Sequence, residues 1–133
     1  MTRDDLNAYF PVNFYPSDET YGQPTERWVF DVLVPYYRRM RLAMRIANWT
    51  KKWQCEDFTD TFTLAARLCH RDSPGDDFES LAIGRFDYNP ESGGGHSIAA
   101  IKVRDGRIFL DPQPCLKVIL TTKEENSCTL ALF

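Results

Sequence analysis

The period of the hydrophobic pattern changes once along the chain, and this change separates expected helices from expected strands. Between residues 26 and 47 apolar side chains recur at helical spacing, and a second helical pattern begins at or near Cys55 and runs to about Cys69. Pro35 must kink the first helix or begin its second part, because proline lacks the N–H that an interior helical position needs. From residue 81 onward the pattern is typical of strands.

The C-terminal part predicts five strands joined by short connections. They are expected at residues 81–88, 96–104, 107–111, 116–121 and 128–133. The Asp105-Gly106 pair between the second and third strands is a strong hairpin signal. Short connections imply antiparallel pairing, so helices followed by a sheet predict an α+β fold.

In the first 25 residues the apolar side chains follow neither the helical nor the strand spacing. They carry three prolines and a glycine among aromatic residues, which predicts extended, turn-rich chain that wraps the body of the protein. A length of 133 residues fits one domain. We therefore expect a single domain over 1–133, with a wrap over 1–25, a helical part over 26–70 and an antiparallel sheet over 81–133.

Composition narrows the expected partners. A net charge of −3 argues against nucleic acid, because a phosphate-binding protein normally carries a basic surface. No apolar segment is long enough to span a membrane, and the N-terminus lacks the apolar region of a secretory signal. A cytoplasmic protein without a membrane or nucleic-acid partner is expected. The one basic region, residues 38–45 with Lys51 and Lys52, is interpreted as the solvent-facing side of a helix.

Of the four cysteines, one stands where a helix is expected to begin. The spacings contain no CxxC pair, and a reducing compartment favours free thiols. The N–H groups and dipole at a helix start would stabilise a Cys55 thiolate and lower its pKa, the condition for a nucleophile. Cys69, Cys115 and Cys128 are interpreted as small core residues.

His96 follows three glycines and opens a strand, while Asp111 ends the partner strand of the same hairpin. A thiol nucleophile needs a nearby base, and the base needs a third group that fixes its tautomer. The order Cys55, His96, Asp111 on helix, strand and strand therefore predicts a catalytic triad.

The expected register complicates this triad. A two-residue turn would place Asp111 opposite Ala100 and His96 opposite Cys115, so that Asp111 lies roughly 13 Å down the strand from His96 at about 3.3 Å per residue. Gln113 would be nearer to His96. A bulge or a bent strand would be needed to bring Asp111 closer. We take Asp111 as the first candidate to orient His96 and Gln113 as the second.

The segments around these residues resemble a known superfamily. WQCEDF, within residues 53–62, and GGGHSIAAIKVRDGRIFLDPQ, residues 93–113, resemble the papain-like and transglutaminase-like superfamily. They are closest to small phage-encoded relatives of the C-terminal peptidase domain of a mushroom agglutinin. The resemblance covers under a third of the chain. It implies a papain-like fold and thiol hydrolase chemistry, with Cys55 as nucleophile, His96 as base and Asp111 as orienter.

The sequence indicates the oxyanion donor and any metal site less clearly than it indicates the triad. The papain pattern places a glutamine a few positions before the nucleophile, whereas Gln54 is adjacent to Cys55. The expected donors are the Cys55 backbone N–H and a side chain from Trp53 or Gln54. The proposed chemistry requires no cofactor. Calcium is an option only because the agglutinin-type peptidase is metal-dependent, and the acidic run at 73–80 is interpreted as a solvated turn.

Together these observations predict a cysteine hydrolase, most simply a peptidase that acts on a peptide or protein through an acyl-enzyme. A transglutaminase or deamidase could use the same triad. An alternative from another class is a non-catalytic phage or bacterial interaction or inhibitor protein that keeps the fold. A third is a zinc protein that uses Cys55, His96 and Asp111 as ligands.

Overall fold

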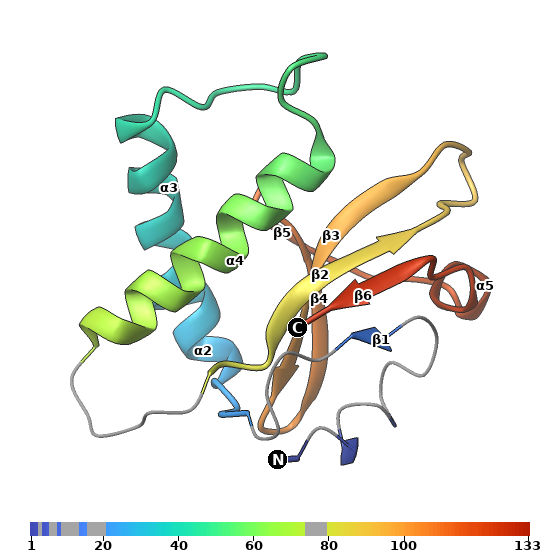
Figure 1. The fold of residues 1–133 in the computed structure, drawn as a ribbon, viewed down its shortest axis with the longest axis horizontal. Coiled ribbons are helices and arrows are strands. Elements are labelled where there is room, and N and C mark those ends of the chain that lie inside the picture. Colours follow the sequence, from blue (N-terminus) through green and yellow to red (C-terminus); the bar gives the residue numbers. More distant parts are fainter. Residues whose placement is uncertain (3, 6–7, 9–13, 16–20, 74–79) are drawn as a thin grey trace.

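The structure is a computed structural model that describes residues 1–133 except 3, 6–7, 9–13, 16–20 and 74–79. Figure 1 shows a group of helices beside a twisted sheet. The helices are α2 (Glu26–Trp28), η1 (Val29–Leu33), α3 (Val34–Ala43), α4 (Cys55–Asp72) and α5 (Thr122–Asn126). The strands are β1 (Phe14–Tyr15), β2 (Ile83–Tyr88), β3 (His96–Val103), β4 (Gly106–Asp111), β5 (Leu116–Val118) and β6 (Leu130–Leu132).

The sheet has six strands in the order β1-β6-β2-β3-β4-β5. All neighbours pair antiparallel except β1, which runs parallel to β6. The prediction of about five antiparallel strands is therefore wrong at this edge. A strand of two residues has no period to read, and its parallel partner lies at the other end of the chain. The remainder of the predicted wrap lies partly outside the described residues.

The first helical segment changes its winding before the proline. η1 is a π-helix, and the N–H of Val34 donates to the carbonyl of Val29. Pro35 then stands in the first turn of α3, directly after this π-helical turn. The expected second start at Pro35 is confirmed, although α3 ends at Ala43 rather than near residue 47.

α4 begins at Cys55, as the pattern predicted. Gln54 caps it, and the carboxylate of Asp57 accepts from the Gln54 backbone N–H at 2.7 Å to close a capping box. Its apolar side packs on β2 and β3. That side consists of Phe58, Phe62, Ala65, Ala66 and Cys69, all buried. This packing places the first turn of α4, which begins at Cys55, against the sheet.

The two faces of the sheet bury different clusters. The helical face packs Ala99, Ile101 and Leu110 against residues of α3 and α4. The opposite face buries Phe86, Ile98, Phe109, Tyr21 and Phe133. Because successive strand residues point to opposite faces, β3 contributes to both cores and is almost completely buried.

The β3–β4 hairpin turns at a different place from the expected one. Val103 pairs with Gly106, so Arg104 and Asp105 form the turn and Gly106 already belongs to β4. Gly106 has φ +144°, which side chains with a Cβ rarely adopt. The register is consequently shifted by two residues from the predicted pairing of Val103 with Ile108.

Candidate functional site

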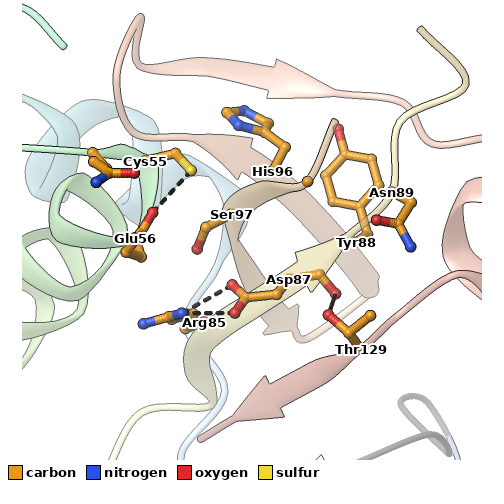
Figure 2. A pocket seen from close by; sticks show the side chains of 11 residues that line it. Cys55, Glu56, Arg85, Asp87, Tyr88, Asn89, His96, Ser97 and Thr129 are labelled. Carbon is orange, nitrogen blue, oxygen red and sulfur yellow. Dashed lines mark hydrogen bonds and ion pairs between the residues drawn. The ribbon is translucent and has the colours of Figure 1, made fainter. Parts of the chain in front are cut away.

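A polar pocket lies where the N-terminus of α4 meets β2 and the start of β3. Its volume is about 320 Å³, within the range of small-molecule sites. Figure 2 shows Cys55 and His96 at one end, Ser97 further in, and the paired Arg85 and Asp87 beyond it. The complete lining is Gln54, Cys55, Glu56, Arg85, Asp87, Tyr88, Asn89, Gly95, His96, Ser97 and Thr129. We call this the Cys55–His96 pocket.

The imidazole of His96 is held by Asp111. Its Nε2 lies 2.8 Å from Asp111 Oδ2, and the other carboxylate oxygen accepts from the Gln113 backbone N–H at 3.0 Å. The hydrogen bond to Asp111 raises the pKa of His96, partly opposed by burial. An ionised Asp111 can only accept, so Nε2 carries a proton and Nδ1 is the acceptor in the neutral ring.

The shifted hairpin register explains how Asp111 reaches His96. Ala99 pairs with Leu110, so the continued ladder places Asp111 opposite Ile98, two residues from His96. A diagonal neighbour of this kind lies about 7–8 Å away between backbones, within reach of two side chains. The predicted separation along the strand is therefore wrong, and the predicted choice of Asp111 over Gln113 to hold the ring is confirmed by the hydrogen bond.

Cys55 stands at the helix start but is not prepared as a thiolate. Its Sγ donates to Glu56 Oε2 at 3.1 Å. Burial, followed by this hydrogen bond to Glu56, raises the pKa of the Cys55 thiol, although the backbone N–H of Ser97 favours the ionised form. The expected lowering of this pKa is wrong because burial of the thiol, together with its hydrogen bond to Glu56, outweighs the helix dipole. Among the described residues no hydrogen bond joins Cys55 to His96.

A buried threonine fixes the distance between α4 and β3 at the pocket. The Thr59 hydroxyl lies 2.9 Å from the carbonyl oxygen of Cys55 and 3.1 Å from that of Ser97. Thr59 is fully buried. Its single proton is shared between the two carbonyls, so one side chain ties the first turn of the helix to the beginning of the strand.

Among the pocket residues that were not identified from the sequence, three form the polar part of its lining beyond His96: Arg85, Asp87 and Ser97. Arg85 donates to both oxygens of Asp87, and the hydrogen bond to Asp87 raises the pKa of Arg85. Ser97 is 3% exposed, and its Oγ has no hydrogen-bond partner among the described residues. Arg85 and Asp87 are two apart on a strand and therefore share a face, a period-two signal that could have indicated them. Nothing in the sequence marks Ser97.

The remaining candidates from the sequence lie at different places. Gln54 lines the pocket as the helix cap, and its side-chain amide lies 3.4 Å from the Lys51 carbonyl. Trp53 lines another hollow and packs edge-on against Phe58. Gln113 lies away from Cys55, with its carbonyl 2.7 Å from the guanidinium of Arg41. Of these three, only Gln54 is in the Cys55–His96 pocket.

The other three cysteines, Cys69, Cys115 and Cys128, are free and buried, as predicted. No group of three or more His, Cys, Asp or Glu within the described ranges is arranged to hold a metal ion. Most of the acidic run at 73–80 lies outside the described residues, so its interpretation as a solvated turn stays a prediction. No helix in the described part of the chain is long and apolar enough to cross a membrane. The cytoplasmic location stays a prediction.

Comparisons with known proteins find similarity in structure alone. No family model and no curated protein sequence matches the chain. A crystal structure of Polyporus squamosus lectin bound to the epitope Neu5Aca2-6Galb1-4GlcNAc aligns with a TM-score of 0.72 and 18% identity. It covers 100% of this chain and 49% of the lectin chain. A complex of PSL1a with E64 aligns with a TM-score of 0.74 and 19% identity, covering 100% and 51%. The chain thus spans about half the length of these neighbours.

These neighbours correct the assignment made from the sequence. The first is described as a lectin with a bound sialylated epitope, and neither is described as a papain-like or transglutaminase-like protein. The expected papain-like fold is replaced by the fold that this chain shares with half of the lectin chain. The predicted cysteine peptidase, its classification as an enzyme with a catalytic triad, its phage relatives and its peptide or protein substrate are withdrawn.

Proposed function

We propose that this protein is a binding protein that holds a small, hydroxyl-rich ligand of the carbohydrate class in the Cys55–His96 pocket. The observation that carries the proposal is the Ser97 hydroxyl, which is buried in the pocket lining without a hydrogen-bond partner among the described residues. An unpaired buried polar group costs about 1–3 kcal/mol, and a ligand hydroxyl would satisfy it after a side-chain shift that opens the Ser97 Oγ to the pocket.

The other walls of the pocket suit the same ligand class. Arg85 supplies only donors and Asp87 only acceptors, side by side, and a sugar hydroxyl can donate to one while it accepts from the other. Glu56 adds a second carboxylate, and the ring of Tyr88 forms a largely apolar side of the pocket. The guanidinium, the carboxylates and the aromatic ring would each contact a different part of a polar ligand and so fix its orientation.

The state of the thiol supports binding rather than reaction. The Cys55 thiol directs its proton to Glu56, and within the part of the chain that the structure describes Nδ1 of His96 makes no hydrogen bond to this thiol. Both groups can therefore contact a ligand as neutral polar atoms. We place Cys55 and His96 among the ligand contacts and Asp111 behind His96 as the group that fixes its tautomer.

The likeness to the lectin supports the choice of a carbohydrate over other polar ligands. It shows a common fold at 18% identity, and this chain corresponds to 49% of the lectin chain. The carbohydrate specificity is therefore tested directly with the epitope described for that lectin and with its component sugars.

The test is a titration of the protein with Neu5Acα2-6Galβ1-4GlcNAc, galactose and N-acetylglucosamine, followed by amide NMR shifts. Saturable shifts at Ser97, Arg85 and His96 are expected with at least one of these sugars. Ser97→Ala removes the unpartnered hydroxyl and should weaken binding about fivefold to tenfold, corresponding to one lost hydrogen bond. Thr122→Ala removes an exposed hydroxyl on α5 and serves as the matched control.

Two results would overturn the proposal. The first is the absence of shifts at the pocket with every sugar at millimolar concentration, while the spectrum shows a folded protein. The second is turnover: cleavage of a supplied amide substrate that disappears in Cys55→Ala would show that the pocket performs chemistry rather than binding alone.

A further inference from the structure

A basic and apolar surface lies where α3 ends and a loop leads to α4; its hollow shares no lining residue with the neighbouring Cys55–His96 pocket. Residues 38–54 contain six Lys or Arg and no Asp or Glu, in a chain whose net charge is −3. Large apolar side chains are exposed here beside the basic ones. They are Leu42 at 79%, Met44 at 51% and Trp49 at 48% exposure.

The loop encloses a hollow of about 520 Å³ whose lining is mainly apolar. It is lined by Met44, Arg45, Ile46, Ala47, Asn48, Thr50 and Trp53. The indole Nε1 of Trp53 is buried and has no acceptor among the described residues. The hollow is therefore an apolar volume with an unsatisfied donor buried in the side chain of one wall residue, so it suits an apolar group, and a carbonyl oxygen beside that group could pair with the donor once the indole shifts.

Arg45 stands at the rim in a backbone conformation that favours glycine. α3 ends in a Schellman motif, in which Ile46 N–H donates to the Arg41 carbonyl and Arg45 N–H to the Leu42 carbonyl. Arg45 has φ +58°, the left-handed region where a residue with a Cβ is strained. A strained arginine at a position that glycine would fill more favourably indicates a use for its charge.

The loop is held in place before any partner arrives. Arg41 stacks over the ring of Phe58 and donates to the carbonyls of Ile46 and Ala47. The same guanidinium donates to the Gln113 carbonyl at 2.7 Å, which joins the loop to the turn after β4. A preformed hollow reduces the ordering cost of binding.

We propose that this surface binds an acidic polypeptide segment that inserts one apolar side chain into the hollow. The apolar anchor would occupy the space beside Ile46 and Trp53, and the indole N–H would donate to a backbone carbonyl of the segment. Arg45, Lys51 and Lys52 would face its carboxylates, because none of the three has a carboxylate partner among the described residues. A concave site with a buried donor favours an inserted side chain over a lipid surface, which is bound by protruding side chains. The surface is separate from the carbohydrate site, so each proposal can fail without the other.

The test is fluorescence anisotropy with a pool of fluorescein-labelled peptides, each with Leu, Ile, Phe, Met or Trp flanked on both sides by glutamates. At least one peptide is expected to bind saturably, and added salt should weaken the binding. Lys51→Glu combined with Lys52→Glu should weaken it by about tenfold or more. Arg104→Glu combined with Lys123→Glu, the same total charge change at two exposed positions outside this surface, is the matched control and should leave it unchanged.

Arg45→Gly separates the proposed role from a merely structural one. Glycine relieves the strained backbone, so the variant should melt at a higher temperature than the wild type while it binds the peptide more weakly. The proposal is overturned if no peptide of the pool binds, or if peptides with glycine at the anchor position bind equally well. It is also overturned if phosphatidylserine vesicles, and not the peptides, bind in a manner that the Lys51 and Lys52 changes abolish.

Discussion

The hydrogen bond between His96 and Asp111 makes stability depend on pH in a direction that Asp111→Asn would reveal. The asparagine carbonyl can still accept from the Gln113 backbone N–H, which lies 3.0 Å from Asp111 Oδ1. Its amide would then face Nε2 of His96 as a donor. The neutral ring would have to accept through Nε2 and carry its proton on Nδ1, so the substitution reverses the tautomer seen by the pocket.

The expected magnitude follows from the partial burial of the pair. A hydrogen bond to a charged group contributes about 1.5–3 kcal/mol, and side-chain exposures of 26% and 19% favour the lower end. The pKa of His96 is raised in the folded protein, so its contribution is complete below the unfolded value near 6.5. It is lost as the pH rises through the higher folded pKa. Asp111→Asn should therefore cost about 1–2 kcal/mol near pH 5 and about 0.5 kcal/mol or less near pH 9.

The assay is urea unfolding at both pH values, together with NMR titration of the His96 ring. The variant should titrate at lower pH than the wild type, because the carboxylate that favours imidazolium is gone. Asp105→Asn, at the exposed turn, removes the same charge and should change neither measurement. An equal loss of stability at both pH values, or an unchanged titration of His96, would show that Asp111 acts through its shape and not through its charge.

Three further substitutions and one control test the surrounding structure. Thr59→Val removes the hydroxyl shared by two carbonyls and should lower the free energy of unfolding by about 1–3 kcal/mol, measured by urea titration; a loss within error would mean that water replaces it. Glu56→Gln should lower the pKa of the Cys55 thiol, seen as faster iodoacetamide labelling at neutral pH, and an unchanged rate would assign the raised pKa to burial alone. Gly84→Ala would place a Cβ 2.0 Å from the backbone oxygen of Leu132 in β6, and thermal unfolding should show a destabilisation of about 3 kcal/mol or more. Gly95→Ala is the control: the added Cβ would have no atom within 4 Å, so the melting temperature should stay close to that of the wild type.

The long helix, whose apolar residues recur at regular helical spacing, could be predicted from the sequence. α4 begins at Cys55 as expected because an amphipathic pattern and an acidic first turn coincide there. α5 was missed although Thr121 and Glu124 form a capping box that the sequence displays. The two-residue β1 could not be read, since its pairing with β6 depends on tertiary contacts that leave no local signal.

The site was only partly readable, for a different reason. Residue types and order led to Cys55, His96 and Asp111, and two of these three are joined by a hydrogen bond. The state of the thiol depends on its burial and on which acceptor lies closest, and the structure shows that this acceptor is Glu56. Ser97 matters because it lacks a partner, a property that exists only after the chain has folded.

The position of Asp111 shows how a local backbone choice determines the chemistry of a distant pair. Asp105-Gly106 fits a two-residue turn, yet Gly106 adopts φ +144° within β4 and the turn moves to Arg104 and Asp105. This displaces every pair of the ladder by two residues while it keeps each side chain on its face, so the hydrophobic pattern is equally satisfied in both registers. The apolar residues therefore cannot distinguish the registers. What distinguishes them is the turn, and only the observed one brings Asp111 next to His96. The tautomer presented to the pocket is consequently determined at the far end of the hairpin, by a glycine that contacts neither residue.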